Sequence, residues 1–537
     1  MKLTRRRGGT AGRALLLLMS AVLVASCGSL LPNPSPTPGQ PRELRVTVVD
    51  RSSQAVIAGV RLSGAGVEAV TDRAGTAVVN APRGASISAA RDGFDAGGGK
   101  VPDDGDLTIA LRSNVVRGTV TTVDGRPIAG VRVFVEGSST LATTDGKGTY
   151  ALPGVPQHGT LIYKMPGFRL GAIPIDEQMT KNVALPAFVA RGLYAPSAIF
   201  EAHGRLDDLL DLIDRTEVNA MVIDVKETSG KLYWATDLPV ARAMGAVMEH
   251  PLFTLEELLP KLKARGIYTI ARMVVMKDNT VGRARPDLAV VNSATGEPWR
   301  DYGGGIWLDP FNPGVAEYIA ALAGDLADKG FDEVQLDYVR FFSDGDFSVS
   351  DTNLPDTQSF RLPAMRRFFR VVSQALETKR AFFSADVFPI SFIATDDQGI
   401  GQRPEVIMPY VDYFSPMVYP SHYANGTFGF ATPNDHPYEV IDDTLKIMNR
   451  QRAGLRMVIR PWIQDFGVGR FPPYTASQVL AEMKAARDNG TQGWMIWNAR
   501  AYFTTAALGG PIEGEDAGPV TTALPPSPGS PAATSTP

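Results

Sequence analysis

The feature that most constrains this chain is a regular alternation of short apolar runs with longer amphipathic stretches over residues 193–503. The runs have the length of strands, and the stretches between them, such as 206–215, 255–265 and 315–329, carry apolar residues at helical spacing. Strands that alternate with helices pair in parallel, and eight such units in about 310 residues are typical of a (β/α)8 TIM barrel. A doubly wound sheet is the alternative. The eight runs are 193–196, 220–226, 268–275, 333–341, 382–388, 413–419, 457–464 and 493–498.

A second constraint lies at the start of the chain. Lys2 and the basic run 5–7 precede an apolar segment over 14–25, and small residues and Cys27 follow, which is typical of a secretory signal. The apolar segment is shorter than the roughly 20 residues of a membrane-spanning helix. Cys27 is the one cysteine in the sequence, so we expect neither an internal disulfide nor a cysteine zinc cluster.

The motif Val24-Ala25-Ser26-Cys27 resembles the bacterial lipobox, whose cysteine is diacylated and becomes the mature N-terminus. The resemblance implies that residues 1–26 are a lipoprotein signal peptide and that lipid on Cys27 holds an exported protein on a membrane of the cell envelope. An ordinary signal peptide with a chance cysteine is the alternative. Residues 27–42 and 511–537, rich in Pro, Ser, Thr or Gly, are predicted to be a disordered tether and a disordered tail.

Two segments between the tether and the barrel, 43–112 and 113–187, repeat one another. Both contain short alternating strands separated by turn residues, which predicts two small all-β sandwich modules. The repeated residues are Ala-Gly-Val-Arg at 58–61 and 129–132, Thr-Asp at 71–72 and 144–145, and Gly-Phe at 93–94 and 167–168.

The second segment carries an ordered set of motifs over 115–153: G-x-V, then D-G-x-P-I-A-G-V-x-V, then T-D-x-x-G-x-Y. This order resembles the carboxypeptidase regulatory-like domain, which has a prealbumin-like fold. The resemblance implies an accessory module rather than a peptidase. Its role as a spacer or as a carbohydrate-binding module stays open.

The composition and the absent motifs exclude several function classes. The net charge is −4 and the one dense basic run lies in the predicted leader, so we expect no nucleic-acid partner. The five histidines form no H-E-x-x-H pair, and the sequence has no G-x-S-x-G motif. We therefore expect a reaction without a metal or another cofactor. The sequence does not predict an oligomeric state.

Polar residues gather where the predicted strands end, which is where the active site of a (β/α)8 barrel lies. Carboxylates and aromatic rings at one barrel mouth suit glycoside hydrolysis, because two carboxyl groups act on the glycosidic bond and rings stack on sugars. Period-two alternation predicts that the inward residues include Asp224, Lys226, Gln335, Asp337, Ser384, Asp386, Ser415, Met417 and Tyr419.

Motifs at these strand ends look like those of a bacterial family called "putative glycosyl hydrolase domain", over essentially all of residues 190–505. The resemblance implies a barrel with glycoside hydrolase activity. Met417-Val418-Tyr419 and the terminal Trp497 also resemble family-18 chitinases, but Val339 stands where the catalytic glutamate of that pattern falls, so we do not expect a chitinase-type mechanism. The family motifs are V-I-D-V-K at 222–226, Q-L-D-Y-V-R-F at 335–341, S-A-D-V-F at 384–388, S-P-M-V-Y-P at 415–420 and W-M-I-W-N at 494–498.

The fourth and fifth strands supply the predicted catalytic pair. Inward carboxylates at the ends of neighbouring strands approach within about 5 to 6 Å, which is the separation of a retaining pair. We predict Asp337 as the nucleophile and Asp386 as the acid/base, with Glu227 as the substitute acid. The alternative for Asp337 is a structural ion pair with Arg272 or Arg340.

The remaining polar and aromatic residues at the strand ends are predicted to bind the substrate. Asp224, Lys226 and Glu227 also allow a buried charge network as an alternative. The predicted substrate-binding residues are Asp224, Lys226, Arg272, Arg340, Tyr419, His422, Gln464, Trp497 and Asn498.

The sequence thus predicts a glycoside hydrolase, in a domain over 188–510, that acts on an extracellular or envelope polysaccharide. The alternative function is a carbohydrate-binding or scaffold lipoprotein without turnover. Whether two strand-end carboxylates converge at a workable separation distinguishes the hydrolase from the protein without turnover.

Overall fold

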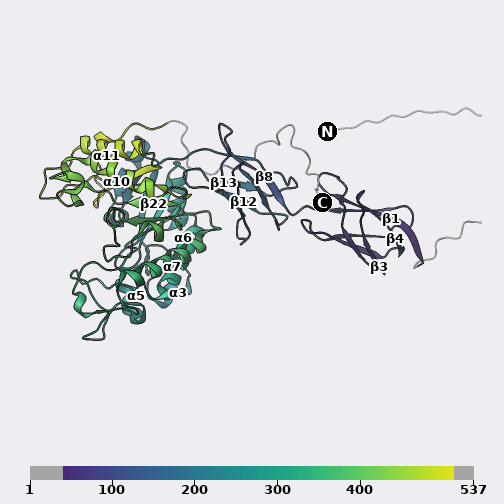
Figure 1. Cartoon of the computed structure of the whole chain (residues 1–537), viewed down its shortest axis with the longest axis horizontal. Helices are drawn as coiled ribbons and strands as arrows, with labels where there is room; N and C mark the ends of the chain where they lie inside the picture. Colours follow the sequence, from purple (N-terminus) through teal and green to yellow (C-terminus); the bar gives the residue numbers. More distant parts are fainter. Residues whose placement is uncertain (1–39, 513–537) are drawn as a thin grey trace, which may run out of the picture. The chain divides into compact units, whose positions relative to one another are not determined.

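The computed structural model describes residues 40–512, which form two compact units (Figure 1). The first unit runs up to Arg91 and includes Ala96–Leu111, and the second holds Asp92–Asp95 and the chain from Arg112. The predicted signal peptide, Cys27, most of the tether and nearly all of the tail lie outside the described residues. Within 40–512 no helix combines the length and apolar character needed to cross a membrane.

The two N-terminal modules are β-sandwiches. The strands of the first are β1 (Pro41–Asp50), β2 (Arg61–Gly64), β3 (Val67–Val70), β4 (Thr76–Pro82), β5 (Ser86–Ala90), β6 (Gly97–Lys100) and β7 (Leu107–Leu111). Those of the second are β8 (Val116–Thr122), β9 (Arg132–Val135), β10 (Leu141–Thr143), β11 (Thr149–Leu152), β12 (Thr160–Lys164), β13 (Gly171–Pro174) and β14 (Val183–Leu185).

Both sandwiches have the same topology, which confirms the internal repeat. The first pairs sheet β4-β1-β7 with sheet β3-β2-β5-β6, and the second pairs β11-β8-β14 with β10-β9-β12-β13. The middle strand of each three-stranded sheet is antiparallel to one neighbour and parallel to the other.

The repeated Thr-Asp motifs have a structural cause. The Thr71 and Thr144 hydroxyls each donate to one backbone carbonyl and accept from one backbone amide, at 2.7 to 2.9 Å. The Asp72 and Asp145 carboxylates each accept from the backbone amides two and four residues later, at 2.9 Å. Each motif therefore ties down the turn that follows it.

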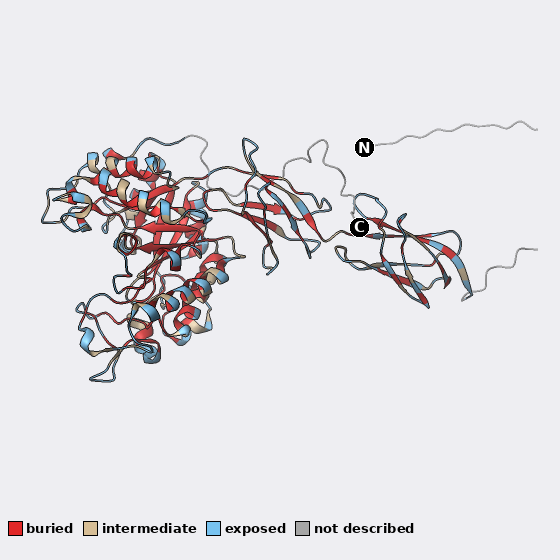
Figure 2. Ribbon diagram, in the orientation of Figure 1, coloured by how far each residue is buried: buried red, intermediate tan, exposed pale blue. Residues whose placement is uncertain are grey.

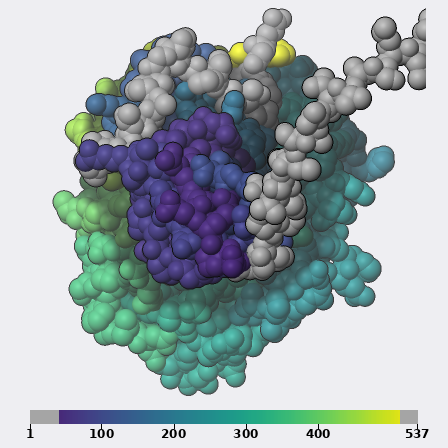
Figure 3. Space-filling model, turned by 90° about the vertical axis from the view of Figure 1, so that its right-hand side faces the viewer, coloured from purple at the N-terminus to yellow at the C-terminus, as the bar shows by residue number. Residues whose placement is uncertain are grey.

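The first sandwich begins earlier than predicted. Strand β1 starts at Pro41, inside the segment predicted as tether, because its first residues already pair with β4, Pro41 opposite Pro82. The outer surface of the first sandwich is purple in Figure 3. Its exposed residues alternate with core residues along strands such as β5 and β7.

The rest of the second unit is the predicted barrel. Its sheet has the order β23-β22-β21-β19-β17-β16-β15-β25-β24, and every neighbouring pair is parallel. The strands are β15 (Ala190–Ala195), β16 (Ala220–Lys226), β17 (Tyr268–Val274), β19 (Glu333–Asp337), β21 (Phe382–Val387), β22 (Tyr413–Pro416), β23 (Val458–Ile459), β24 (Trp462–Gln464) and β25 (Gly493–Trp497). A separate two-stranded ribbon pairs β18 (Val291–Asn292) with β20 (Ser350–Asp351).

The prediction of one continuous seventh strand is wrong, because it is broken into β23 and β24 at Arg460 and Pro461. Proline has no N–H to donate and marks an irregularity within a sheet. Met417 still bridges to Trp462, so β22 borders both pieces and the sheet closes on itself. Counting the two pieces as one strand gives the predicted eight-stranded barrel.

Helices surround the barrel, with a buried side against the sheet and an exposed side, whereas barrel strands such as β16, β17, β19 and β21 are buried along their whole length (Figure 2). Such burial on both faces explains the unbroken apolar runs in the sequence. The helices are α1 (Ala198–Glu201), α2 (Arg205–Asp214), α3 (Pro239–Ala243), α4 (Leu255–Lys263), α5 (Asn279–Ala284), α6 (Pro313–Lys329), α7 (Gln358–Leu376), α8 (Ile390–Ile393), α9 (Pro404–Ile407), α10 (Pro437–Gln451) and α11 (Ala476–Asp488).

The long helix α6 shows how local sequence sets these boundaries. The Asn312 side chain accepts from the Gly314 amide at its start, and Pro313 occupies the first turn. Gly330 ends the helix in the left-handed region, at φ 104°.

The second sandwich is bound to the barrel through buried charges. Arg132 of β9 forms an ion pair with Asp412 at 2.5 Å, and both side chains are nearly sealed from solvent. The ammonium of Lys164, fully buried, donates to the backbone carbonyls of Leu376, Lys379 and Ala381, which follow α7 or end it. The sandwich therefore supplies hydrogen bonds and a counter-charge that the barrel needs.

Candidate active site

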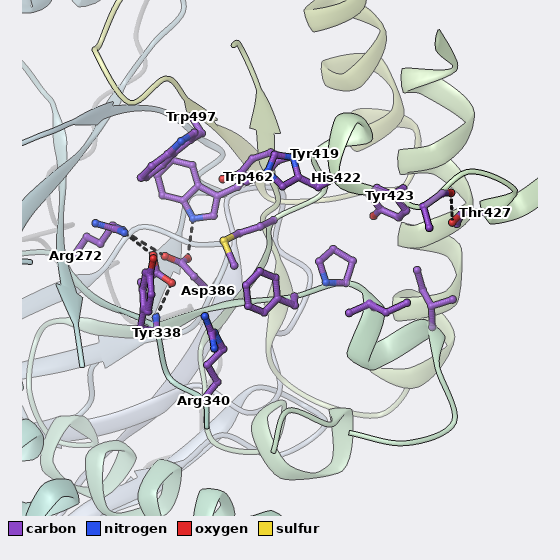
Figure 4. A pocket seen from close by; sticks show the side chains of 17 residues that line it. Arg272, Tyr338, Arg340, Asp386, Tyr419, His422, Tyr423, Thr427, Trp462 and Trp497 are labelled. Atoms are coloured by element: carbon purple, nitrogen blue, oxygen red, sulfur yellow. Dashed lines mark hydrogen bonds and ion pairs between the residues drawn. The ribbon is translucent and has the colours of Figure 1, made fainter. Parts of the chain in front are cut away.

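A pocket of about 440 Å³ opens where the barrel strands end (Figure 4). One part of its wall is charged, and the rest is aromatic or aliphatic. The lining residues are Arg272, Asp337, Tyr338, Arg340, Asp386, Phe388, Pro389, Ile390, Ile393, Met417, Tyr419, His422, Tyr423, Ala424, Thr427, Trp462 and Trp497.

The register of β19 and β21 places the predicted catalytic pair side by side. Leu336 lies opposite Ala385 in this parallel ladder, so the next residues, Asp337 and Asp386, are neighbours across the two strand ends. Neighbouring strands lie about 4.8 Å apart and directly opposed side chains point to the same face. Both carboxyl groups line the same pocket.

Arg272 of β17 is the charge centre of the site. Its Nη2 lies 2.5 Å from Asp337 Oδ2, its Nη1 donates to Asp224, and its Nε lies 3.8 Å from Asp386 Oδ2. Burial opposes the charge of Arg272, but Asp224 and Asp337 together hold its pKa well above the ordinary value. The sequence allowed either Arg272 or Arg340 as an ion-pair partner of Asp337. In the structure the partner is Arg272.

Asp337 is held by its own turn as well as by Arg272. Its Oδ1 accepts the backbone N–H of Tyr338 at 2.6 Å, and Tyr338 has a left-handed φ of 52°. A non-glycine residue in that region is strained, which is common at functional sites. The turn and the guanidinium therefore fix the Asp337 carboxylate in one orientation.

Asp386 is a carboxyl group that favours its protonated form. It is 2% exposed, and its Oδ1 accepts the indole N–H of Trp462 at 2.7 Å. Burial and the negative charge of Asp337 raise its pKa well above the ordinary value, against the opposing effects of Arg272 and Trp462. The two adjacent carboxyl groups thus differ in environment: Asp337 forms an ion pair with a cation, whereas burial favours the protonated form of Asp386.

Asp224 lies behind Arg272 and outside the pocket lining. It is fully buried, and burial raises its pKa to about 7 although Arg272 and the Tyr194 hydroxyl both stabilise its charge. The Tyr194 ring stacks on Trp497 with centroids 4.0 Å apart. Asp224 and Tyr194 therefore hold Arg272 and Trp497 in place from below.

Aromatic rings form the wall opposite the carboxyls. Trp497 ends β25, and Tyr419 and His422 follow β22; Figure 4 shows these three side chains on one side of the pocket. The ring centroids of Tyr419 and His422 lie 5.6 Å apart. Rings that stand at the mouth of a carboxylate pocket are suited to stacking on the apolar face of a sugar. Trp497, Tyr419 and His422 lie where the sequence predicted them.

Arg340 also lies in the pocket, on the side of Tyr338 and Phe388. Its guanidinium is near the rings of Trp307, Tyr338 and Phe388, with 4.9, 5.2 and 5.0 Å to the centroids. It is therefore held as a rigid cation beside the carboxyl pair.

Besides Asp224, four more predicted site residues lie outside this pocket. Glu227 accepts a hydrogen bond from Ser197 at 2.7 Å. Lys226 is sealed in an ion pair with Asp278 at 2.9 Å, because the register shifts between Asp224 and Lys226. Their predicted roles stay untested, but neither side chain faces the pocket.

The other two hold loops at the barrel mouth. Gln464 accepts hydrogen bonds from Ser421, next to His422, at 2.9 Å and 3.2 Å. Asn498 donates to the carbonyls of Asp465 and Tyr502 at 2.6 Å and 2.8 Å. Asn498 also lines a second pocket that shares Trp497 with the first.

The sequence prediction missed Tyr194 and Trp462. Trp462 had a signal, because it is an indole near a strand end, but the break at Pro461 resets the alternation that would have turned it inward. Tyr194 lies on the first strand, where no motif drew attention to it. Among residues 40–512, no cluster of three or more His, Cys, Asp or Glu side chains is arranged to hold a metal ion.

Comparison with known proteins agrees with this architecture. Residues 192–503 match the family described as "Putative glycosyl hydrolase domain", and residues 115–186 match the carboxypeptidase regulatory-like domain. No curated protein sequence matches the chain.

Three solved structures illustrate the similarity. A hypothetical protein from Ruminiclostridium thermocellum is 30% identical over 36% of this chain and 97% of its own, with a TM-score of 0.32. The PgaB (BpsB) glycoside hydrolase domain from Bordetella bronchiseptica is 15% identical over 58% and 94%, with a TM-score of 0.41. The glycoside hydrolase domain of PelA from Pseudomonas aeruginosa is 12% identical over 60% and 99%, with a TM-score of 0.35. The match over 192–503 covers more than half of the chain, which therefore belongs to the putative glycosyl hydrolase domain family.

Proposed function

We propose that the protein is a retaining glycoside hydrolase that acts on an extracellular or envelope polysaccharide. The observation that carries the proposal is the pair Asp337 and Asp386, adjacent on neighbouring strands and in different electrostatic environments. A retaining enzyme needs one ionised and one protonated carboxyl group about 5 to 5.5 Å apart.

In the first step Asp386 donates its proton to the glycosidic oxygen, and Asp337 attacks the anomeric carbon to form a glycosyl ester as the leaving sugar departs. In the second step the ionised Asp386 takes a proton from water, which attacks the same carbon and releases Asp337. The buried Nε of Arg272 makes no hydrogen bond within the described residues and lies 3.8 Å from Asp386. It therefore offsets the charge that Asp386 gains between the two steps.

The remaining groups bind and orient the sugar. Trp497 and Tyr419 provide stacking surfaces, and the aliphatic residues of the pocket exclude water from the two carboxyl groups. Lipid on Cys27, which lies outside the described residues, would hold the enzyme on the outer side of a membrane.

The test is incubation of the purified protein with a panel of polysaccharides, with release of reducing ends as the readout. Proton NMR of the first product separates retention from inversion of the anomeric centre. Release by wild type but not by Asp337→Asn supports the proposal. Binding without turnover for every polysaccharide would favour the carbohydrate-binding alternative, and an inverted first product would overturn the retaining mechanism.

A further inference from the structure

Arg340 differs from the other buried arginines of the protein. Seven arginines are buried among residues 40–512, and six of them form an ion pair with a carboxylate: Arg112, Arg132, Arg191, Arg272, Arg361 and Arg460. The seventh, Arg340, is 8% exposed and has no ion pair with any described carboxylate. A buried charge without a partner is costly, and proteins seldom keep one without a reason.

The side chain of Arg340 is also fixed in place. Its Nη1 donates to the carbonyl of Phe341 and to the hydroxyl of Ser343, both at 2.9 Å. Three aromatic rings surround the guanidinium at about 5 Å. Arg340 therefore cannot swing out to solvent without losing these contacts.

The unused edge of the guanidinium faces the substrate. Nε and Nη2 form no hydrogen bond with any residue that the structure describes, and Figure 4 shows the guanidinium end pointing into the pocket toward Asp386. Parallel N–H groups on one edge of a guanidinium match the two oxygens of a carboxylate.

We propose that the substrate pocket recognises an acidic sugar, a uronic acid residue, whose carboxylate binds the Nε and Nη2 of Arg340. This assignment rests on the proposed sugar-binding function of the pocket and names its substrate class. The ligand then supplies the ion-pair partner that no carboxylate among residues 40–512 provides for Arg340. A sulfate ester offers similar oxygens, but the two-donor edge favours the planar carboxylate.

The test compares ligands that differ only at the acidic group. Short oligouronides, both glucuronides and galacturonides, are titrated calorimetrically into the full-length protein beside the same oligosaccharides with every carboxyl group reduced to an alcohol. Sulfated neutral oligosaccharides form the third arm. The variants are Arg340→Met, Arg340→Lys and Arg205→Met; the last removes a guanidinium that stacks on Tyr502 outside the pocket.

We expect wild type and Arg205→Met to bind at least one oligouronide about ten- to a hundredfold more tightly than its reduced form, as a charge-assisted contact predicts. Arg340→Met should lose this preference while it keeps affinity for the reduced sugar, and Arg340→Lys should keep part of it. Near-ultraviolet circular dichroism checks that each variant is folded.

Three outcomes would overturn the assignment: equal affinity of wild type for every acidic and reduced pair, an unchanged preference in Arg340→Met, or a preference for sulfated over carboxylated sugars. Hydrolysis is measured separately. Cleavage of neutral polysaccharides with no preference for uronides would support the hydrolase activity and contradict the acidic-sugar site. Tight uronide binding without any cleavage would support the acidic-sugar site and contradict the hydrolase activity.

Discussion

The two pocket carboxyls should respond differently to amidation, although both are needed for turnover. Asp337→Asn removes one charge from a buried ion pair with Arg272, whereas Asp386→Asn replaces a carboxyl group whose pKa is raised by burial and by the charge of Asp337. Although Asp337→Asn is nearly isosteric, the loss of a charge from the buried ion pair should lower the melting temperature.

The size of the Asp337 effect follows from what remains around Arg272. A hydrogen bond to a charged group contributes about 1.5 to 3 kcal/mol, and a buried charge left with no partner costs about 3 to 5 kcal/mol. Arg272 keeps its contact with Asp224 in the variant, so we expect the smaller figure, a loss of about 1.5 to 3 kcal/mol in unfolding free energy.

The Asp386 effect depends on pH. The pKa of Asp386 in the folded protein is raised above its ordinary 3.8, so the unfolded chain loses this proton at a lower pH than the folded protein does. The contribution of Asp386 to stability is therefore complete below about pH 4 and falls as pH rises through the folded pKa. Asp386→Asn, which has no proton to lose, should become more stable relative to wild type as pH rises.

Scanning calorimetry at several pH values between about 4 and 9 measures the stability of both variants, and reducing-end assays measure their turnover. Glu227→Gln is the matched control, because it amidates a strand-end carboxylate outside the pocket. Both pocket variants should lose several orders of magnitude in turnover. Wild-type turnover in folded Asp337→Asn would refute the nucleophile, and an identical pH dependence of stability in wild type and Asp386→Asn would refute the raised pKa.

Three further predictions test separate parts of the structure. Trp462→Phe removes a hydrogen bond that stabilises ionised Asp386, so the alkaline limb of the pH–rate profile should move to higher pH. Burial opposes the charge of Asp412, but Arg132 and other cations lower its pKa from 3.8 to about 2. This shift stabilises the folded protein by about 2 kcal/mol above about pH 4, and the stabilisation is lost as pH falls through about 2. In denaturant unfolding, Arg132→Met should therefore lose less stability on acidification than wild type does. Cys27→Ala should release the protein from the membrane fraction, and retention after a salt wash would contradict lipid anchoring.

The contact through Arg132 also bears on whether the barrel can stand alone. The prediction of separate domains implies that a chain starting near Ala190 can fold without the β modules, because each module has its own turns and alternating strands. Without the second sandwich, Asp412 loses its ion pairs with Arg132 and Lys164 and keeps only the one with Arg456, at 3.7 Å. We expect such a truncated barrel to melt at a lower temperature than the full chain.

Much of the fold was readable from local pattern. Strands buried on both faces must be apolar along their length, so the barrel strands stood out as runs, and repeated turns identified two equivalent sandwiches. The adjacency of Asp337 and Asp386 also followed, because consecutive parallel strands with matched ends place their last inward residues together. The period-two alternation mispredicted which side chains face inward where the backbone departs from a regular strand, at Pro461 and at the register shift before Lys226.

The sequence by itself therefore determined the domain order, the barrel and the adjacency of Asp337 and Asp386 at its mouth, since these depend on hydrophobic periodicity and chain direction. Only the tertiary structure decided how the charges pair: that Arg272 forms an ion pair with Asp337, that burial and Asp337 raise the pKa of Asp386, and that Arg340 has no ion pair with a described carboxylate. Charge pairing and burial depend on distances between residues far apart in the sequence, and periodicity carries no information about those distances.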